Sequence, residues 1–273
     1  METFKPYLRL YFGSTRMIHI IILALLPVII LANTMINNTG LLIHPDGIPA
    51  EFGIRMAQSA YLTSAIVVFM IFAAITGSMM FNAYSSKESR LAALVLPAST
   101  KAKFWSYFVV HVVAFFAVFL VSLFIVDWLR VALLTVFGAG AFAETLPVGD
   151  LLALNMFGDV SLRDSATIAI CAYGSAMLLQ SFFALGSIVW KSKAFIKTIA
   201  TLAALGTVCV ILVCISVGVF LPEYVEPRFS WMEGNQPPTW LPWILAAFFL
   251  FFTVFNYVVA YMRLKETELQ NRW

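Results

Sequence analysis

Long apolar stretches separated by short polar segments make up almost the whole chain. Six of the stretches are long enough to cross a membrane, because a transmembrane helix needs about 20 consecutive apolar residues. They lie at roughly 17–36, 59–80, 104–126, 166–189, 199–221 and 242–262. The pattern therefore predicts an all-α polytopic membrane protein with six transmembrane helices, residues 1–273 forming a single transmembrane domain.

The first polar segment, 1–16, has a helical pattern of its own. Its apolar residues follow the spacing i, i+3, i+4, i+7 and i+8, which places them on one face of a helix. These residues are Phe4, Tyr7, Leu8, Tyr11 and Phe12. Gly13 ends the pattern. We expect an amphipathic helix that lies in the membrane interface before the chain turns into the bilayer.

The segment 81–103, between the second and third spans, carries strong helix signals. Ser85 and Glu88 have the spacing of a capping box, in which each side chain binds the backbone N–H of the other residue. Residues 90–96 follow with good helix formers, and Pro97 ends the run. We predict a short helix with a charged start and an apolar end.

Apolar side chains of this short helix need a surface to pack against. They are Leu91, Leu94 and Val95. Lipid headgroups would supply one such surface, and a cytosolic partner protein would supply another. After the helix, Ser99 is placed to cap the next helix, which leads through Lys101 into the third span.

Two longer segments, 127–165 and 222–241, lie on the other side of the membrane from 81–103. Residues 128–142 within the first are apolar but too short to span, so we interpret them as an outer extension of the third helix or an interfacial piece. Asp127 and Arg130 are three residues apart and can pair on one helix face.

Turn signals divide the rest of these outer segments. Asp150 is predicted to cap a short helix over 151–157, and Ser161 with Asp164 to cap the fourth span. Segment 222–241 contains or adjoins five prolines, which predicts a structured, largely non-helical loop. The prolines are Pro222, Pro227, Pro237, Pro238 and Pro242.

The distribution of charged residues indicates which polar segments face the cytoplasm. The segments 1–16, 81–103, 190–198 and 263–273 hold 13 of the 17 Lys and Arg residues and only four acids. Basic segments of membrane proteins stay in the cytoplasm, so we expect both termini there. The same rule argues against 128–142 as a seventh span, which would place 190–198 outside. Apolar residues make up 62% of the chain and charged residues 11%, a balance that excludes an ordinary soluble domain.

The segment FNAYSSKESRLAALVLPASTKAKF, residues 81–104, resembles the cytoplasmic loop of ABC-2-type transporter permeases. That loop commonly has an acidic residue, a Leu-rich helix, a Leu-Pro-x-Ser signature and then a basic residue. The matching residues here are Glu88, Leu94, Leu96, Pro97, Ser99 and Lys101. The Leu-Pro-Ala-Ser form is especially similar to members from Bacteroidota, which implies that the protein lies in a bacterial inner membrane. In that family the outer helical insertion lies between spans five and six, whereas the largest outer segment here lies between three and four.

The resemblance implies a coupling helix that docks on a cytosolic ABC ATPase subunit, which would bind ATP and Mg. The residues then expected to act in coupling are Ser85, Lys87, Glu88, Arg90, Leu91, Leu94, Pro97 and Ser99. A second permease copy or a sister permease would complete the transporter. Small residues cluster in spans one, four and five, and we expect part of the dimer contact from spans one and five.

No chemistry is assigned to this chain. It has no GxxxxGK[ST] phosphate loop, no HExxH motif and no acid or cysteine spaced to complete a metal site with His19 or His111. We therefore expect no enzyme activity, no bound cofactor and no catalytic residue. Four polar residues within the spans are candidates to line a translocation path, or they simply join helices. They are Asn33, His111, Gln180 and Asn256.

The leading hypothesis is the transmembrane permease subunit of an ATP-driven exporter of a hydrophobic or amphipathic substrate. The chain has 25 Phe and 11 Met residues, which suit apolar cargo, although lipid-facing packing accounts for most of them. A secondary carrier or channel needs an ion site, and no Asp, Glu, Lys or Arg lies at the centre of a span. A non-transporting membrane anchor or sensor that recruits a cytosolic protein is the third hypothesis. An intramembrane enzyme, the fourth, lacks a catalytic constellation.

Overall fold

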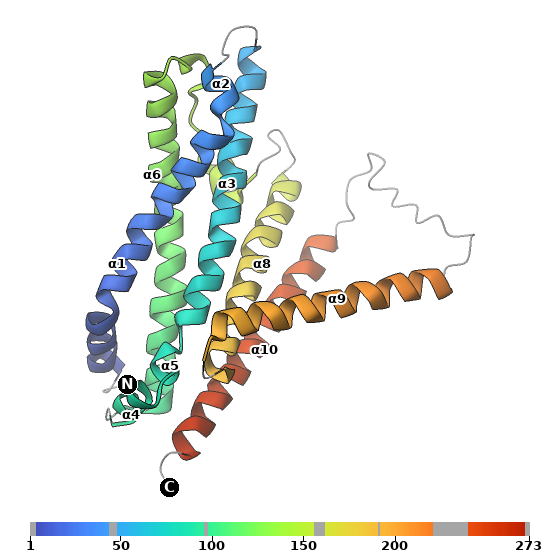
Figure 1. Ribbon diagram of the computed structural model, residues 1–273. Helices are drawn as coiled ribbons and strands as arrows, with labels where there is room; N and C mark the ends of the chain where they lie inside the picture. The colour runs from blue at the N-terminus through green and yellow to red at the C-terminus, as the bar shows by residue number, and fades with distance from the viewer. Residues whose placement is uncertain are drawn as a thin grey trace.

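The computed structural model describes residues 4–43, 48–95, 98–155, 162–190, 192–220 and 240–270. Within these ranges the backbone forms helices and turns and contains no β-strand. Most of the long helices run side by side as a bundle (Figure 1). The predicted all-α membrane architecture is confirmed.

Six helical segments of the described chain are long and apolar enough to cross a membrane. They are Ile20–Asn37, Ala50–Tyr84, Thr100–Val136, Ser165–Val189, Ala194–Ile211 and Leu241–Glu268. The helices that contain them are α1 (Phe4–Asn37), α3 (Ala50–Met79), α5 (Thr100–Phe108) with α6 (Ala114–Val136), α8 (Leu162–Val189), α9 (Ala194–Phe220) and α10 (Leu241–Gln270). Several extend past the apolar stretch because the polar residues that flank it are also good helix formers.

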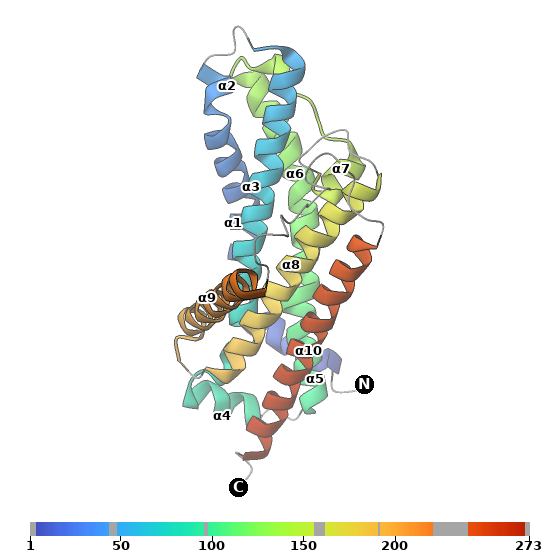
Figure 2. The ribbon, with the colours of Figure 1, turned by 90° about the vertical axis from the view of Figure 1, so that its right-hand side faces the viewer.

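Short elements mark the two ends of the bundle. The start of α1, the short helix α4 (Lys87–Val95) and the end of α10 lie toward one end, here called the basic end (Figures 1 and 2). The 3₁₀ turn η1 (Asn82–Tyr84) leads into α4. The opposite end carries α2 (Thr39–Ile43), η3 (Gly140–Phe142) and α7 (Val148–Ala153).

The third span is a single helical rod with a π-helical turn in it. η2 (Val109–Val113) joins α5 to α6, and α6 continues to Val136 before the chain turns. Residues 128–136 are therefore the predicted outer extension of the third helix. The chain then bends at Gly138, whose φ of +83° is readily adopted only by glycine, and forms η3.

Aromatic side chains form much of the core. Near the middle of α3, Phe69 stacks on Phe119 of α6 with ring centroids 3.9 Å apart. A second apolar cluster at the basic end includes Phe81, Tyr107 and Leu264. Helices α3 and α8 approach closely because Gly77 has no side chain, and a Cβ there would lie 2.4 Å from the carbonyl oxygen of Gln180.

Helix α9 separates from the other long helices. Figure 1 shows α9 turning away from α8, and Figure 2, viewed from the side toward which it projects, shows it nearly end-on. Most of its side chains from 199 to 211 are exposed. This helix therefore offers an apolar surface that the described part of the chain leaves uncovered.

Some sequence expectations need correction. The helix predicted over 1–16 is present from Phe4, but it does not end at Gly13: α1 continues as one helical element to Asn37, since one glycine weakens a helix without breaking it. Helix α7 begins at Val148 after Pro147, so Asp150 lies in its first turn and is not its cap. Ser161 and most of the proline-rich loop 222–241 lie outside the described residues.

Candidate functional site

The start of α4 is fixed by a reciprocal pair of serines. The Ser86 hydroxyl oxygen accepts from the backbone N–H of Ser89 (3.1 Å), and the Ser89 hydroxyl oxygen accepts from the N–H of Ser86 (3.4 Å). The predicted capping box of Ser85 and Glu88 is thus displaced by one residue. The displacement arises because Ser85 closes η1, donating its backbone N–H (3.0 Å) and its hydroxyl (2.7 Å) to the carbonyl of Asn82.

Helix α4 has one buried and one exposed face. Ala93 is buried, whereas Leu91 is 53% exposed and Val95 is 81% exposed. Leu91 and Val95 are four residues apart, so they form one apolar stripe on the free face of the helix. Arg90 is half-buried and donates to the carbonyl of Tyr84 (3.3 Å), which holds α4 against η1.

The structure describes only part of the segment that carries the residues expected to act in coupling. The side chains of Lys87, Glu88 and Leu94 and the whole of Pro97 lie outside the described part of the chain. The predicted cap at Ser99 is confirmed, because its hydroxyl oxygen accepts from the backbone N–H of Ala102 (3.2 Å).

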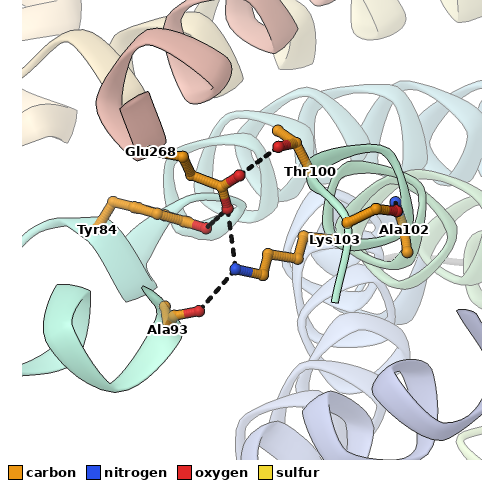
Figure 3. A network of polar contacts seen from close by, with 7 residues as sticks. Tyr84, Ala93, Thr100, Ala102, Lys103 and Glu268 are labelled. Atoms are coloured by element: carbon orange, nitrogen blue, oxygen red, sulfur yellow. Dashed lines mark hydrogen bonds and ion pairs between the residues drawn. The ribbon is translucent and has the colours of Figure 1, made fainter. Parts of the chain in front are cut away.

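A buried ion pair joins α4 to the membrane helices. The Lys103 ammonium lies 2.9 Å from a carboxylate oxygen of Glu268, and the two residues are only 2% and 4% exposed. The same ammonium donates to the carbonyl of Ala93 (2.8 Å), in the last turn of α4 (Figure 3). Lys103 thereby satisfies one of the helix-end carbonyls that have no partner within α4.

Two hydroxyl groups complete this site, which we call the Lys103–Glu268 site. Thr100 donates to one oxygen of Glu268, and Tyr84 donates to the other (3.4 Å). The five contacting residues come from η1, α4, α5 and α10, as Figure 3 shows. Each charged group is paired and hydrogen-bonded, which is what allows it to be buried. A displacement of α4 would therefore act on α5 and α10 together.

Polar side chains also join helices inside the membrane region. Gln180 on α8 donates to the hydroxyl of Thr76 (3.0 Å) and to the carbonyl of His111 (2.8 Å). His111 lies in the π-helical turn, where the regular i→i+4 pattern is interrupted and a carbonyl can accept a side-chain donor. Next to Gln180, the Ser181 hydroxyl accepts from Asn256 of α10 (2.9 Å).

The fourth intramembrane candidate, Asn33, lies elsewhere. It donates to the hydroxyl of Ser64 on α3 (3.0 Å). Ser64 and Thr76 are separated by about 18 Å of helix. The structure thus brings His111, Gln180 and Asn256 together around α8 and leaves Asn33 toward the opposite end. All four occupy contacts between helices.

The predicted pair of Asp127 and Arg130 is confirmed, and it is buried. A guanidinium nitrogen lies 2.8 Å from the Asp127 carboxylate, and the same nitrogen donates to the carbonyl of Glu144 (2.6 Å). The second carboxylate oxygen accepts from the backbone N–H of Leu146 (3.1 Å). The pair thus fixes segment 143–147 against α6, and the guanidinium also lies 5.7 Å from the ring centroid of Tyr61.

The sequence did not identify the Lys103–Glu268 site. Two signals pointed to it: Glu268 is one of only four acids in the basic segments, and Lys103 immediately precedes the third apolar stretch. Their contact depends on how α5 and α10 pack, which no local pattern contains. Among the described residues there is no group of three or more His, Cys, Asp or Glu side chains that could hold a metal ion.

Comparison with protein-family models, with curated proteins and with solved structures finds no match to this chain. The six long apolar helices therefore provide the identification, which is a multi-pass helical membrane protein. The observations that bear on a more specific function are the motif in residues 81–104 and the geometry of the basic end.

Proposed function

We propose that this chain is the transmembrane permease subunit of an ATP-driven transporter of the ABC-2 type, exporting a hydrophobic or amphipathic substrate. ATP and Mg would bind a separate cytosolic ATPase subunit. The observation that carries the proposal is α4, a short capped helix whose apolar stripe of Leu91 and Val95 is exposed while its other face is tied to the bundle.

The exposed stripe supports docking of a protein. Leu91 and Val95 form part of a surface that water or headgroups would otherwise contact, and apolar residues presented together favour a partner with an apolar groove. The sequence around them carries the Leu-rich helix of the ABC-2 resemblance. In this proposal the ATPase groove covers the stripe.

The Lys103–Glu268 site supports transmission of a force. The Lys103 ammonium contacts both the end of α4 and Glu268 near the end of α10. Closure of two ATPase subunits would move α4, and this site would pass the movement to the third and sixth spans. The proposal places the basic end in the cytoplasm, as the charge distribution favours. The membrane would be a bacterial inner membrane, as the resemblance implies.

Helix α9 supports a second permease copy. Its small residues are exposed, and nothing in the described structure lies within 4 Å of a Cβ built on Gly206. Small residues allow close helix packing in lipid. The exposed small residues are Ala200, Ala203, Ala204 and Gly206, together with Ala24 on α1. We propose that α9 and α1 each pack against the partner permease.

A membrane anchor or sensor that recruits a cytosolic protein through α4 is the second candidate, because the same exposed stripe favours it. The two functions differ in whether the partner is an ATPase whose turnover depends on this chain. The test is purification of the tagged protein from its native membrane and identification of any ABC ATPase that co-purifies with it. The permease proposal expects a stable complex containing two ATPase subunits, and recovery of a partner without an ATP-binding domain would favour the anchor.

A further inference from the structure

A groove of about 560 Å³ runs along the outside of the bundle between α5 and α10. Its walls come from the face of α5 that carries Lys101, Trp105 and Phe108, and from the face of α10 between Leu250 and Tyr261. Both faces belong to segments apolar enough to cross a membrane. The groove therefore opens toward lipid, near the basic end.

Aromatic contacts between the two helices form the floor of this α5–α10 groove. Phe108 meets Tyr257 edge-to-face with ring centroids 5.2 Å apart, and Phe104 meets Tyr261 in the same way at 5.4 Å. Trp105, 54% exposed, stands at the rim. A rigid aromatic floor with an apolar rim suits a hydrocarbon chain better than a polar ligand.

The dimensions fit one leaflet of a bilayer. From Leu250 to Tyr261 the helix rises about 16 Å. Half of the hydrocarbon core is about 15 Å thick. An acyl chain lying along this stretch would therefore reach from the interface to the middle of the membrane.

The only charge among the described residues that line the groove is that of Lys101. Lys101 is exposed, lies one helical turn before Trp105, and makes no ion pair with a described acidic residue. It lies at the end of the groove near Tyr261, where a headgroup would sit. An ammonium group in that position attracts a phosphate.

Two hydroxyl groups on the α10 wall lack a hydrogen-bond partner. Thr253 and Tyr257 both line the groove and are more than nine-tenths buried, and neither hydroxyl has a partner in the described structure. A buried hydroxyl without a hydrogen-bond partner raises the free energy of the protein. A ligand whose acceptor atom binds that hydroxyl therefore binds more tightly. The ester carbonyl of a glycerolipid is such an acceptor, and Tyr257, one turn from Tyr261, is the nearer of the two hydroxyls to the headgroup end.

We propose that the α5–α10 groove binds an anionic phospholipid of the leaflet at the basic end. Its phosphate lies beside Lys101, an ester carbonyl accepts from Tyr257, and one acyl chain lies along the aromatic floor. This site is separate from the Lys103–Glu268 site, and it does not depend on the chain being a permease.

The experiment uses the full-length protein in nanodiscs that contain brominated phosphatidylglycerol or brominated phosphatidylcholine at equal mole fraction. Bromine quenches nearby tryptophan, and the signal of Trp105 is the difference between the wild type and Trp105→Phe. We expect about fivefold stronger apparent binding of phosphatidylglycerol, the effect of one lysine on an anionic lipid. Lys101→Ala should remove this preference, whereas Lys265→Ala, an exposed lysine on α10 outside the groove, should keep it.

Tyr257→Phe separates the ester contact from the charge contact. Both lipids have ester carbonyls, so this variant should weaken quenching by both about threefold and leave their ratio unchanged. Equal quenching by the two lipids in the wild type, or an unchanged preference in Lys101→Ala, would overturn the proposal. An absence of quenching by either lipid would also overturn it, because the groove would then be covered by protein.

Discussion

Lys103 and Glu268, 165 positions apart in the sequence, form a buried ion pair of 2.9 Å that also holds the last turn of α4. The pair lies where the short helix of the basic end meets the third and sixth spans. Burial makes the pair sensitive to change, because the loss of one partner leaves the other as an unpaired charge away from water.

Removing one partner should destabilise the protein more than removing both. Lys103→Met should lower the free energy of unfolding by about 3–5 kcal/mol, because the Glu268 carboxylate stays buried. The double variant Lys103→Met/Glu268→Gln should recover much of this loss, since a neutral amide can still bind Tyr84 and Thr100. The measurement is chemical unfolding of the purified protein in detergent micelles.

An exposed ion pair on α10, the helix that carries Glu268, provides the control. Arg263 and Glu266 lie 3.0 Å apart with both side chains more than half exposed. Glu266→Gln should change the free energy of unfolding by less than about 1 kcal/mol. If Lys103→Met were as mild as Glu266→Gln, the buried pair would not hold α4 to the bundle.

The pair at the opposite end should hold a loop. Asp127→Asn removes the charge that pairs with Arg130 and weakens the acceptor for the N–H of Leu146. We expect a loss of about 3 kcal/mol and faster thiol labelling of a cysteine placed at Ala143. Unchanged labelling would show that segment 143–147 is held by other contacts.

Thiol labelling in intact cells tests the assignment of sides, in a background without Cys171, Cys209 and Cys214. Cysteines at Ser86 and Thr267 should be shielded from an impermeant reagent, whereas one at Gly149 should react. This follows from the accumulation of basic residues at one end of the bundle. Labelling of the cysteine at Ser86 and protection of the cysteine at Gly149 would show that the topology is the reverse of the one we expect.

Cross-linking tests the second permease copy. Cysteines placed one at a time along residues 199–211 of α9 should form disulfides between two copies with a helical period, strongest at Ala200, Ala203, Ala204 and Gly206. Leu205, which is also exposed and lies on the opposite face of α9 from Ala203, serves as the comparison site. A uniform yield along α9, or a single permease copy in native mass spectra with ATPase bound, would contradict the proposed dimer.

Periodicity and charge predicted most of the fold, because both depend on residues close together in the chain. The six spans, the helix at the start of the chain, the cap at Ser99 and the pair of Asp127 with Arg130 follow from spacing alone. The residue that caps α4 does not follow from spacing. Ser85 and Ser86 are adjacent serines, and only the 3₁₀ turn before them decides that Ser86 begins α4.

The candidate site was beyond sequence reasoning for a different reason. Lys103 and Glu268 meet because α5 packs beside the end of α10, and this packing is a property of the whole bundle. The same holds for Gln180, whose partners on α3 and η2 are 104 and 69 positions away. A polar residue in an apolar stretch predicts a partner, but it does not predict which helix supplies it.

ATP hydrolysis by the proposed ATPase partner, reconstituted with this chain in proteoliposomes, tests the central claim most directly. Leu91→Asp and Val95→Asp place a charge on the exposed stripe of α4 and should each reduce permease-stimulated hydrolysis at least tenfold, since an acid in an apolar groove costs a few kcal/mol. Val148→Asp, also on an exposed residue but at the opposite end, should stimulate ATP hydrolysis as the wild type does. Wild-type stimulation by both α4 variants would contradict coupling through this helix.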